Sequence, residues 1–197
     1  MIEFKTKQQH IFTTPVWESM ITVVDNQSIK EYAYKLRNKY PGAQISNRGG
    51  WHSQELDTPL PLSLDELIND LTQFINNYCA EWTGINDLIL GNWWININGK
   101  NNYNAKHDHQ NAILSAVYYV EVLADNTGDL ILHREDSSRY YLGKHVNPAT
   151  HFSTQSYISK PTCGKLVLFP AWTKHSVEMN NSDTERISIA FNFVKPH

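Results

Sequence analysis

The fold is decided by the stretch that begins at Leu88, with LILGNWWININ (88–98) followed by AILSAVYYVEVL (112–123). Short runs of the same character continue to the end of the chain, at residues 128–133, 155–160, 165–169, 175–178 and 186–194. Runs of this length that are rich in Val, Ile, Tyr and Trp are typical of strands. Turn-forming Asn, Asp and Gly residues separate several of them. This part of the chain therefore predicts many short strands.

The residues before Leu88 carry helical signals instead. Apolar residues in 26–39 recur at a loosely helical spacing, and those in 63–84 do so more regularly. Ser63 and Glu66 fit a capping box at the start of the second segment, and Gly84 suits a C-terminal cap. We therefore expect helices over 26–39 and 63–84.

Helices followed by many short strands predict a mainly β protein, with N-terminal helices packed on a sandwich or barrel. The jelly roll is the commonest closed form that also makes a mouth able to hold a ligand. No internal repeat or linker divides the chain. We expect a single domain over residues 1–197, with a helical layer mostly in 1–86 and a jelly-roll core mostly in 87–197.

Composition narrows the class of protein. The 197 residues are 41% hydrophobic and only 19% charged, which excludes a disordered chain. A net charge of -3 argues against nucleic acid as the partner. No apolar run is long enough to cross a membrane, no secretory signal is visible in the first ten residues, and the two cysteines form no CxxC pair. These features favour a cytoplasmic protein (in the host cytoplasm if the chain is viral) with no membrane partner.

The positions of the histidines matter more than their number, which is nine. NAKHDHQ (104–110) places His107 and His109 two residues apart, so that in an extended segment both imidazoles face one way and Asp108 faces the other. This is a chelating geometry, although on its own such a pair is more often a polar strand edge. His175 begins a late strand, and Arg186 and Ser188 open the last one.

This order of residues resembles the Fe(II)- and 2-oxoglutarate-dependent oxygenases, which carry HxD…H…RxS on a double-stranded β-helix, a cupin-like jelly roll. The chain looks particularly like a small family of such oxygenases found in bacteria and marine phages. The resemblance spans nearly the whole chain. It is carried by IFTTPVW (11–17), SNRGGWHS (46–53), HDHQNAILSAVYYV (107–120), FPAWTKHSV (169–177) and RISIAFN (186–192).

The resemblance implies an enzyme, usually a hydroxylase, that uses Fe(II), 2-oxoglutarate as cosubstrate and O2 as second cosubstrate. The implied metal ligands and catalytic residues are His107, His109 and His175. Arg186 would bind the distal carboxylate of 2-oxoglutarate, for which a guanidinium is well suited, and Ser188 would add a hydroxyl donor. Further candidates for cosubstrate binding are Asn96, Asn98 and Tyr119. For the two asparagines the alternative is a turn-forming cluster, because Asn98-Gly99 is itself a hairpin signal.

The chain departs from the family pattern at one ligand, because His109 stands where the usual motif has a carboxylate. With iron bound, a three-histidine site carries one more unit of positive charge than the usual site with a carboxylate ligand, and it also suits Zn(II). Asp108 replaces His109 as a ligand only if the segment is irregular, and the remaining alternative is a metal held by His107 and His175 alone. Two other interpretations remain open: a three-His cupin-type dioxygenase that does not use 2-oxoglutarate, and a non-catalytic metal-binding jelly-roll module. The RxS pair after His175 favours the oxygenase.

The remaining residues of interest receive plainer interpretations. Tyr118 is expected to pack in the core, and Trp172 to pack or to form a substrate wall. Residues 134–154 are polar and carry tyrosines, which is typical of a rim that contacts a small-molecule or peptide substrate. We expect the six other histidines not to be ligands: His10, His52, His133, His145, His151 and His197.

Overall fold

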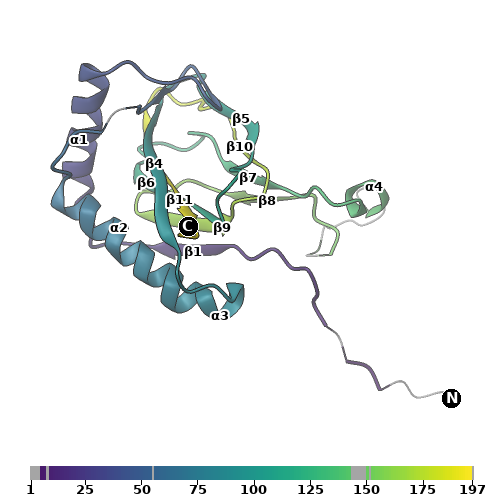
Figure 1. Ribbon diagram of the computed structural model, residues 1–197. Coiled ribbons are helices and arrows are strands. Elements are labelled where there is room, and N and C mark those ends of the chain that lie inside the picture. Colours follow the sequence, from purple (N-terminus) through teal and green to yellow (C-terminus); the bar gives the residue numbers. More distant parts are fainter. Residues whose placement is uncertain (1–4, 8, 55, 143–149, 151, 197) are drawn as a thin grey trace.

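Two antiparallel sheets face each other in the computed structural model, which describes residues 5–7, 9–54, 56–142, 150 and 152–196 (Figure 1). The larger sheet has the order β1-β9-β6-β11-β4-β3 and the smaller one β2-β5-β10-β7-β8. The larger sheet consists of β1 (Trp17–Met20), β3 (Trp51–His52), β4 (Ile89–Asn98), β6 (Leu114–Glu121), β9 (Lys165–Pro170) and β11 (Arg186–Val194). The smaller sheet consists of β2 (Asn47–Arg48), β5 (Tyr103–His107), β7 (Leu130–His133), β8 (Ser156–Ser159) and β10 (His175–Val177). This is the double-stranded β-helix, so the predicted fold class is confirmed.

The larger sheet separates two apolar clusters. Successive side chains of a strand point to opposite faces, so neighbours such as Tyr118 and Tyr119 enter different clusters. Tyr118 lies in the cluster between this sheet and the helices, where its hydroxyl donates to Asn26 Oδ1 at 2.9 Å. Tyr119 lies in the smaller cluster between the two sheets, together with Leu132 and Phe169. The prediction that Tyr118 packs in the core is thus confirmed.

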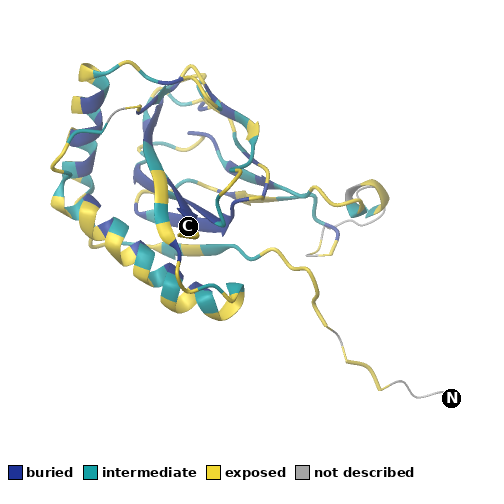
Figure 2. Ribbon diagram, viewed as in Figure 1, coloured by how far each residue is buried: buried dark blue, intermediate teal, exposed yellow. Residues whose placement is uncertain are grey.

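The helices cover the outer face of the larger sheet, with their buried sides turned inward (Figure 2). α1 (Asn26–Lys39) has the predicted bounds. α2 (Leu62–Phe74) continues through a π-helical turn, Ile75–Cys79, into α3 (Ala80–Thr83). Gly84 follows with a φ of 71°, as its predicted cap role requires.

The predicted capping box at Ser63 is wrong. α2 begins one residue earlier, and the carbonyl of Pro61 accepts the amide protons of Leu64 and Asp65. The Ser63 hydroxyl instead makes contacts of 2.9 Å with Ser28 Oγ and 3.2 Å with the carbonyl of Asp25. A tertiary contact between α1 and α2 therefore takes the hydroxyl that the local pattern assigned to the helix end.

Several short elements carry no signal in the sequence. β1, β2 and β3 lie within residues 1–86, and the short helix α4 (Ser138–Leu142) projects from the body (Figure 1). A two-residue strand is too short to show an alternating pattern. The Asn98-Gly99 turn does not close a hairpin, because β4 and β5 belong to different sheets.

Within the described residues, no helix combines the length and apolar character needed to span a bilayer. Both cysteines are free thiols, with Cys79 buried in the core and Cys163 exposed.

Candidate metal centre

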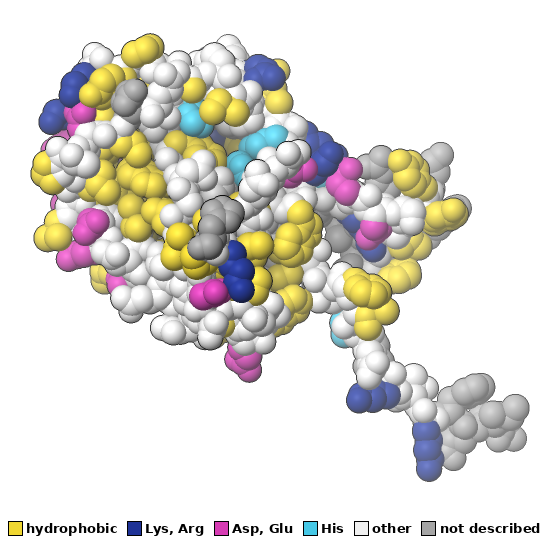
Figure 3. All heavy atoms as spheres, in the orientation of Figure 1, with side chains coloured by type: hydrophobic (Ala, Val, Ile, Leu, Met, Phe, Trp, Pro, Cys, Tyr) yellow, Lys and Arg dark blue, Asp and Glu magenta, His cyan; other side chains and the backbone are white. Residues whose placement is uncertain are grey.

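Three histidines converge at one end of the smaller sheet. His107 ends β5, His109 follows two residues later, and His175 begins β10, where it pairs with His107 across the ladder. The nitrogen atoms that these three side chains offer all lie within 4.8 Å of one another. Residues separated by almost seventy positions are thus brought to the spacing of ligands around one ion. Figure 3 shows histidine side chains reaching the surface of the face in view.

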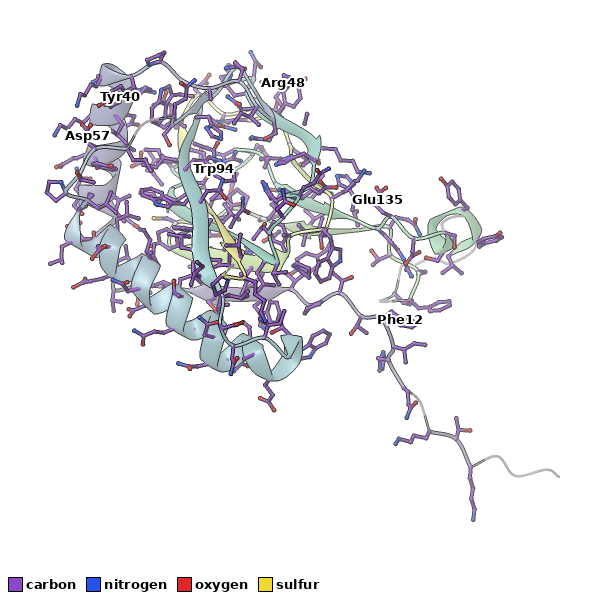
Figure 4. All side chains as sticks on the ribbon, viewed as in Figure 1. Phe12, Tyr40, Arg48, Asp57, Trp94 and Glu135 are labelled. Carbon is purple, nitrogen blue, oxygen red and sulfur yellow. The ribbon has the colours of Figure 1, made fainter. Side chains whose placement is uncertain are left out.

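The backbone fixes two of the three rings. His107 Nδ1 lies 2.7 Å from the carbonyl of Ala105, and His175 Nδ1 lies 2.9 Å from that of Thr173. A ring that donates from Nδ1 keeps the lone pair of Nε2 free for a metal. The third ring, His109, packs against Trp94 with a centroid distance of 5.5 Å, and Trp94 lies on β4 (Figure 4).

Burial keeps the three imidazoles neutral. It is the main cause that lowers the pKa of His109 to about 4 and that of His175 to about 3, and the charge of nearby His107 lowers both further. The pKa of His107 is also lowered by burial, against small opposing effects of Ala105 and Asp108. Metal ions bind neutral imidazole, so the site is in its binding form at neutral pH.

These shifts predict an acid-sensitive metal-free protein. An unfolded histidine has a pKa of about 6.5, so below that pH the unfolded chain binds more protons than the folded one and stability falls. The midpoint of thermal unfolding, measured with chelator present, should therefore drop between about pH 7 and about pH 5. A His175→Gln variant should show a smaller drop, and an equal drop in both proteins would contradict this origin.

No carboxylate joins the cluster in the described part of the chain. Asp108 lies between two of the histidines in sequence, yet it lines a separate hollow on the outer side of His109. The alternation expected for an extended segment thus holds across His107, Asp108 and His109. The group offers three neutral nitrogen donors.

A cavity with a volume of about 50 Å³ extends from the histidines into the space between the sheets. It is lined among others by Asn96, Asn104, Tyr119, Phe169, Arg186 and Ser188. β11 pairs Ser188 with Asn96 on one side and with Tyr119 on the other, which sets these three side chains in a row across the larger sheet.

Arg186 is a buried cation, with 2% of its surface exposed. Its Nη1 donates to the carbonyls of Thr127 at 2.8 Å and Gly128 at 2.6 Å, whereas Nε has no hydrogen-bond partner within the described residues. Those residues also provide no carboxylate in an ion pair with it. Asp129 acts on it electrostatically without forming an ion pair. A buried charge is costly unless it is paired, so this guanidinium is well suited to bind an anionic ligand in the cavity.

Gly128 is needed for this arrangement. Its φ is +95°, and a Cβ there would lie 2.2 Å from the carbonyl oxygen of Glu178 and 3.2 Å from Arg186 Nη1. Only glycine accepts this conformation and this close approach.

Two of the other predicted residues also line the cavity. The Asn96 Oδ1 atom is buried without a hydrogen-bond partner among the described residues, so it can accept a hydrogen bond from a donor within the cavity. Burial raises the pKa of Tyr119 to about 12, against a lowering effect of Arg186. Its hydroxyl therefore stays protonated and can donate to a carboxylate.

Asn98 does not line the cavity. It is fully buried and donates to Asn104 Oδ1 at 3.0 Å. Asn104, which the sequence did not single out, takes the place at the wall. The pairing of β5 with β10 shifts register between His107 and Asn104, and this bulge turns Asn104 inward where strict alternation would turn it outward.

The other described histidines lie outside the metal-ligating group. His133 Nε2 lies 2.8 Å from Ser176 Oγ, and His52 stacks on Trp94 at 5.3 Å. His10 belongs to the exposed N-terminal segment. The predictions for His145, His151 and His197 fall outside the described residues, as does part of the expected rim, at 143–149 and 151. Trp172 is 65% exposed beside the site.

Solved structures share this fold across the whole chain. A prolyl-4-hydroxylase of Pseudomonas putida is 17% identical with a TM-score of 0.62, and the match covers 94% of this chain and 95% of that one. HygX of Streptomyces hygroscopicus, solved with nickel and 2-oxoglutarate bound, is 12% identical with a TM-score of 0.60, over 93% and 83% of the two chains. A prolyl hydroxylase of Trichoplax adhaerens, in complex with a hypoxia inducible factor peptide fragment, is 12% identical with a TM-score of 0.62, over 91% and 83%. At identities this low, the structural similarity establishes the fold and nothing beyond it.

The sequence itself gives the family. Comparison with curated proteins produces no significant match. Residues 92–192, just over half of the chain, match the family described as "Putative 2OG-Fe(II) oxygenase". The matched range contains the three histidines, Arg186 and Ser188.

Proposed function

The chain belongs to the family of 2OG-Fe(II) oxygenases, and we propose that His107, His109 and His175 hold its iron while Arg186 and Ser188 bind its 2-oxoglutarate. The observation that carries this assignment is the buried guanidinium of Arg186, which has two carbonyl partners and no ion-pair partner within the described residues. It lines the same cavity as the three histidines. A dicarboxylate that reaches from the metal to Arg186 would satisfy both ends of that cavity.

The donor set fits the cofactors. Three neutral imidazole nitrogens suit a divalent transition metal and leave coordination positions open. Bound Fe(II) and 2-oxoglutarate supply the activation of O2 that oxidises a substrate, usually by hydroxylation, while the cosubstrate is decarboxylated.

Each side chain of the cavity has a definable task in this reaction. The carbonyls of Ala105 and Thr173 orient two of the ligand rings. Arg186 neutralises the distal carboxylate, and Ser188 and the protonated Tyr119 donate to it. We include Asn96 beside the cosubstrate, where its amide N–H groups can donate to an oxygen of 2-oxoglutarate. Asn98 acts through Asn104, which it holds at the wall. The apolar cluster with Phe169 excludes water from one side.

The direct test is anaerobic titration of the purified protein with Fe(II) and 2-oxoglutarate. We expect a visible metal-to-ligand charge-transfer band that requires both additions. Absence of the band would contradict the proposal. Oxygen uptake with substrate but without 2-oxoglutarate would favour the cupin-type dioxygenase, and metal binding with no succinate formation under any condition would favour the binding module.

Replacing His109 with aspartate should restore the usual ligand set of the family. The carboxylate lowers the charge of the metal-bound site by one unit and is a harder ligand than imidazole. We expect His109→Asp to keep the charge-transfer band and to shift metal preference from Zn(II) toward Fe(II), measured by competition between the two ions. A protein that loses Fe(II) binding would show that the pocket is built for a third imidazole.

The substrate we propose is a small molecule or a peptide, acted on in the cytoplasm. The net charge of -3 supports this choice over nucleic acid.

A further inference from the structure

A second, wider hollow adjoins the metal centre on the outer side of His109. Its volume is about 510 Å³, roughly ten times that of the inner cavity. His109 forms part of the wall of both. The hollow is otherwise lined by Gly91, Asn92, Asp108, Gln110, Asn111, Ala112, Asn192 and Val194. A molecule bound there would lie beside the metal, with the cosubstrate pocket on the other side of the same imidazole.

A chain of hydrogen bonds fixes the polarity of one wall. Ser115 donates to Asn192 Oδ1 at 2.7 Å, and Asn192 Nδ2 donates to Asn92 Oδ1 at 3.1 Å. Because its oxygen is already engaged, Asn92 is left with amide N–H groups to offer. This wall therefore presents donors, which suit a carbonyl or hydroxyl oxygen of a ligand.

Asp108 is the one charged side chain among the residues that line the hollow. The described residues give it no ion-pair partner, and Lys195, the cation next to the lining residue Val194, pairs instead with Asp87 at 3.4 Å. The remaining polar lining residues are carboxamides, which carry no charge. The hollow is thus negatively charged at its rim, and its negative group lies one residue from each of two metal ligands.

We propose that this hollow is the substrate subsite and that it selects a substrate with an ammonium group and a neighbouring carbonyl. Asp108 binds the ammonium group, and the Asn92 amide binds the carbonyl. The inference rests on the proposed function, since it assigns the substrate side of the same metal centre. It also gives Asp108 a task other than metal binding.

The test measures how closely a probe approaches the metal, without turnover. The protein is loaded with Mn(II) and 2-oxoglutarate, and proton NMR line broadening is recorded for amino-acid amides, which carry one ammonium and one carbonyl. The same amides acetylated at the α-nitrogen serve as neutral counterparts. Zn(II)-loaded protein gives the diamagnetic baseline. Asp108→Asn removes the charge and keeps the shape, and Asp125→Asn, at an exposed turn, removes an equal charge elsewhere.

We expect the amides to be broadened more strongly than their acetylated counterparts. Asp108→Asn should reduce the excess about fivefold, as expected for loss of a partly exposed charge pair, while Asp125→Asn leaves it unchanged. Equal broadening of the two probe sets, or an excess that survives Asp108→Asn, would overturn the inference. Failure of the wild-type protein to bind 2-oxoglutarate in the same sample would instead contradict the proposed function.

Discussion

His175→Ala abolishes tight metal binding and, with it, all 2-oxoglutarate turnover: this is the largest effect that the structure predicts. His175 is 5% exposed, and its ring is fixed by the carbonyl of Thr173, so no other side chain can take its position without rearrangement of β10. The two remaining imidazoles cannot complete a facial set of three. Metal affinity, measured by competition with a chromogenic chelator, should fall by more than about 100-fold, since loss of even an outer-sphere partner costs 10–100-fold.

His133→Ala is the matched control for this prediction. His133 lies on β7, which pairs with β10, and its ring contacts Ser176 rather than the metal-ligating group. The His133→Ala variant should keep the metal affinity of the wild-type protein. Circular dichroism should show folded protein for both variants, because removal of a metal ligand leaves the apolar clusters intact. Near-normal affinity in folded His175→Ala would show that the metal site lies elsewhere.

Arg186→Met should have the second large effect: it weakens the binding of 2-oxoglutarate and leaves the binding of the metal unchanged. The variant keeps the volume of the side chain and removes the charge that 2-oxoglutarate would meet in the cavity. Loss of one partner of a buried charge pair costs about 2–5 kcal/mol, so the Kd for 2-oxoglutarate should rise by about 30-fold or more. Anaerobic titration of the charge-transfer band measures this constant, and metal affinity should remain near that of the wild type.

Two further substitutions make the result interpretable. Arg186→Lys keeps the positive charge without the planar fork, so we expect an intermediate loss of 2-oxoglutarate affinity. Arg37→Met removes a surface cation that pairs with Glu185 and should have no effect. Unchanged 2-oxoglutarate affinity in Arg186→Met would refute the role of Arg186, and a thermal melt of each variant separates this from loss of folding.

The strand pattern was sufficient to predict a mainly β sandwich or barrel, and the family resemblance carried by the order of His107, His109, His175 and Arg186 pointed to residues that line one cavity. Alternation along a strand is consistent with this, because it assigns every second side chain to the inner face. Asn98 and Asn104 show where such reasoning ends. A bulge in β5 places Asn104 at the cavity wall and Asn98 behind it, and a bulge depends on pairing with another strand that local sequence does not reveal.

The predicted capping box at the start of α2 was wrong for a similar reason. Ser63 has the right neighbours for a capping box, yet Ser28 and Asp25 of a distant segment compete for its hydroxyl. The short strands β2 and β3 exist because β5 and β4 offer them free edges. In each case the partner that decides the local structure lies far away in the chain.

The division of the core by the larger sheet has an evolutionary consequence. Tight apolar packing is concentrated on the side that faces the helices, where residues such as Leu36, Tyr118 and Phe191 are essentially inaccessible. The opposite side holds a smaller apolar cluster together with the polar residues that line the cavity and the hollow. Selection can therefore alter the lining at positions such as Asn92 or Asp108 with little penalty in folding. The scaffold can thus acquire new substrates through changes on one side of a single sheet while the other side preserves the fold.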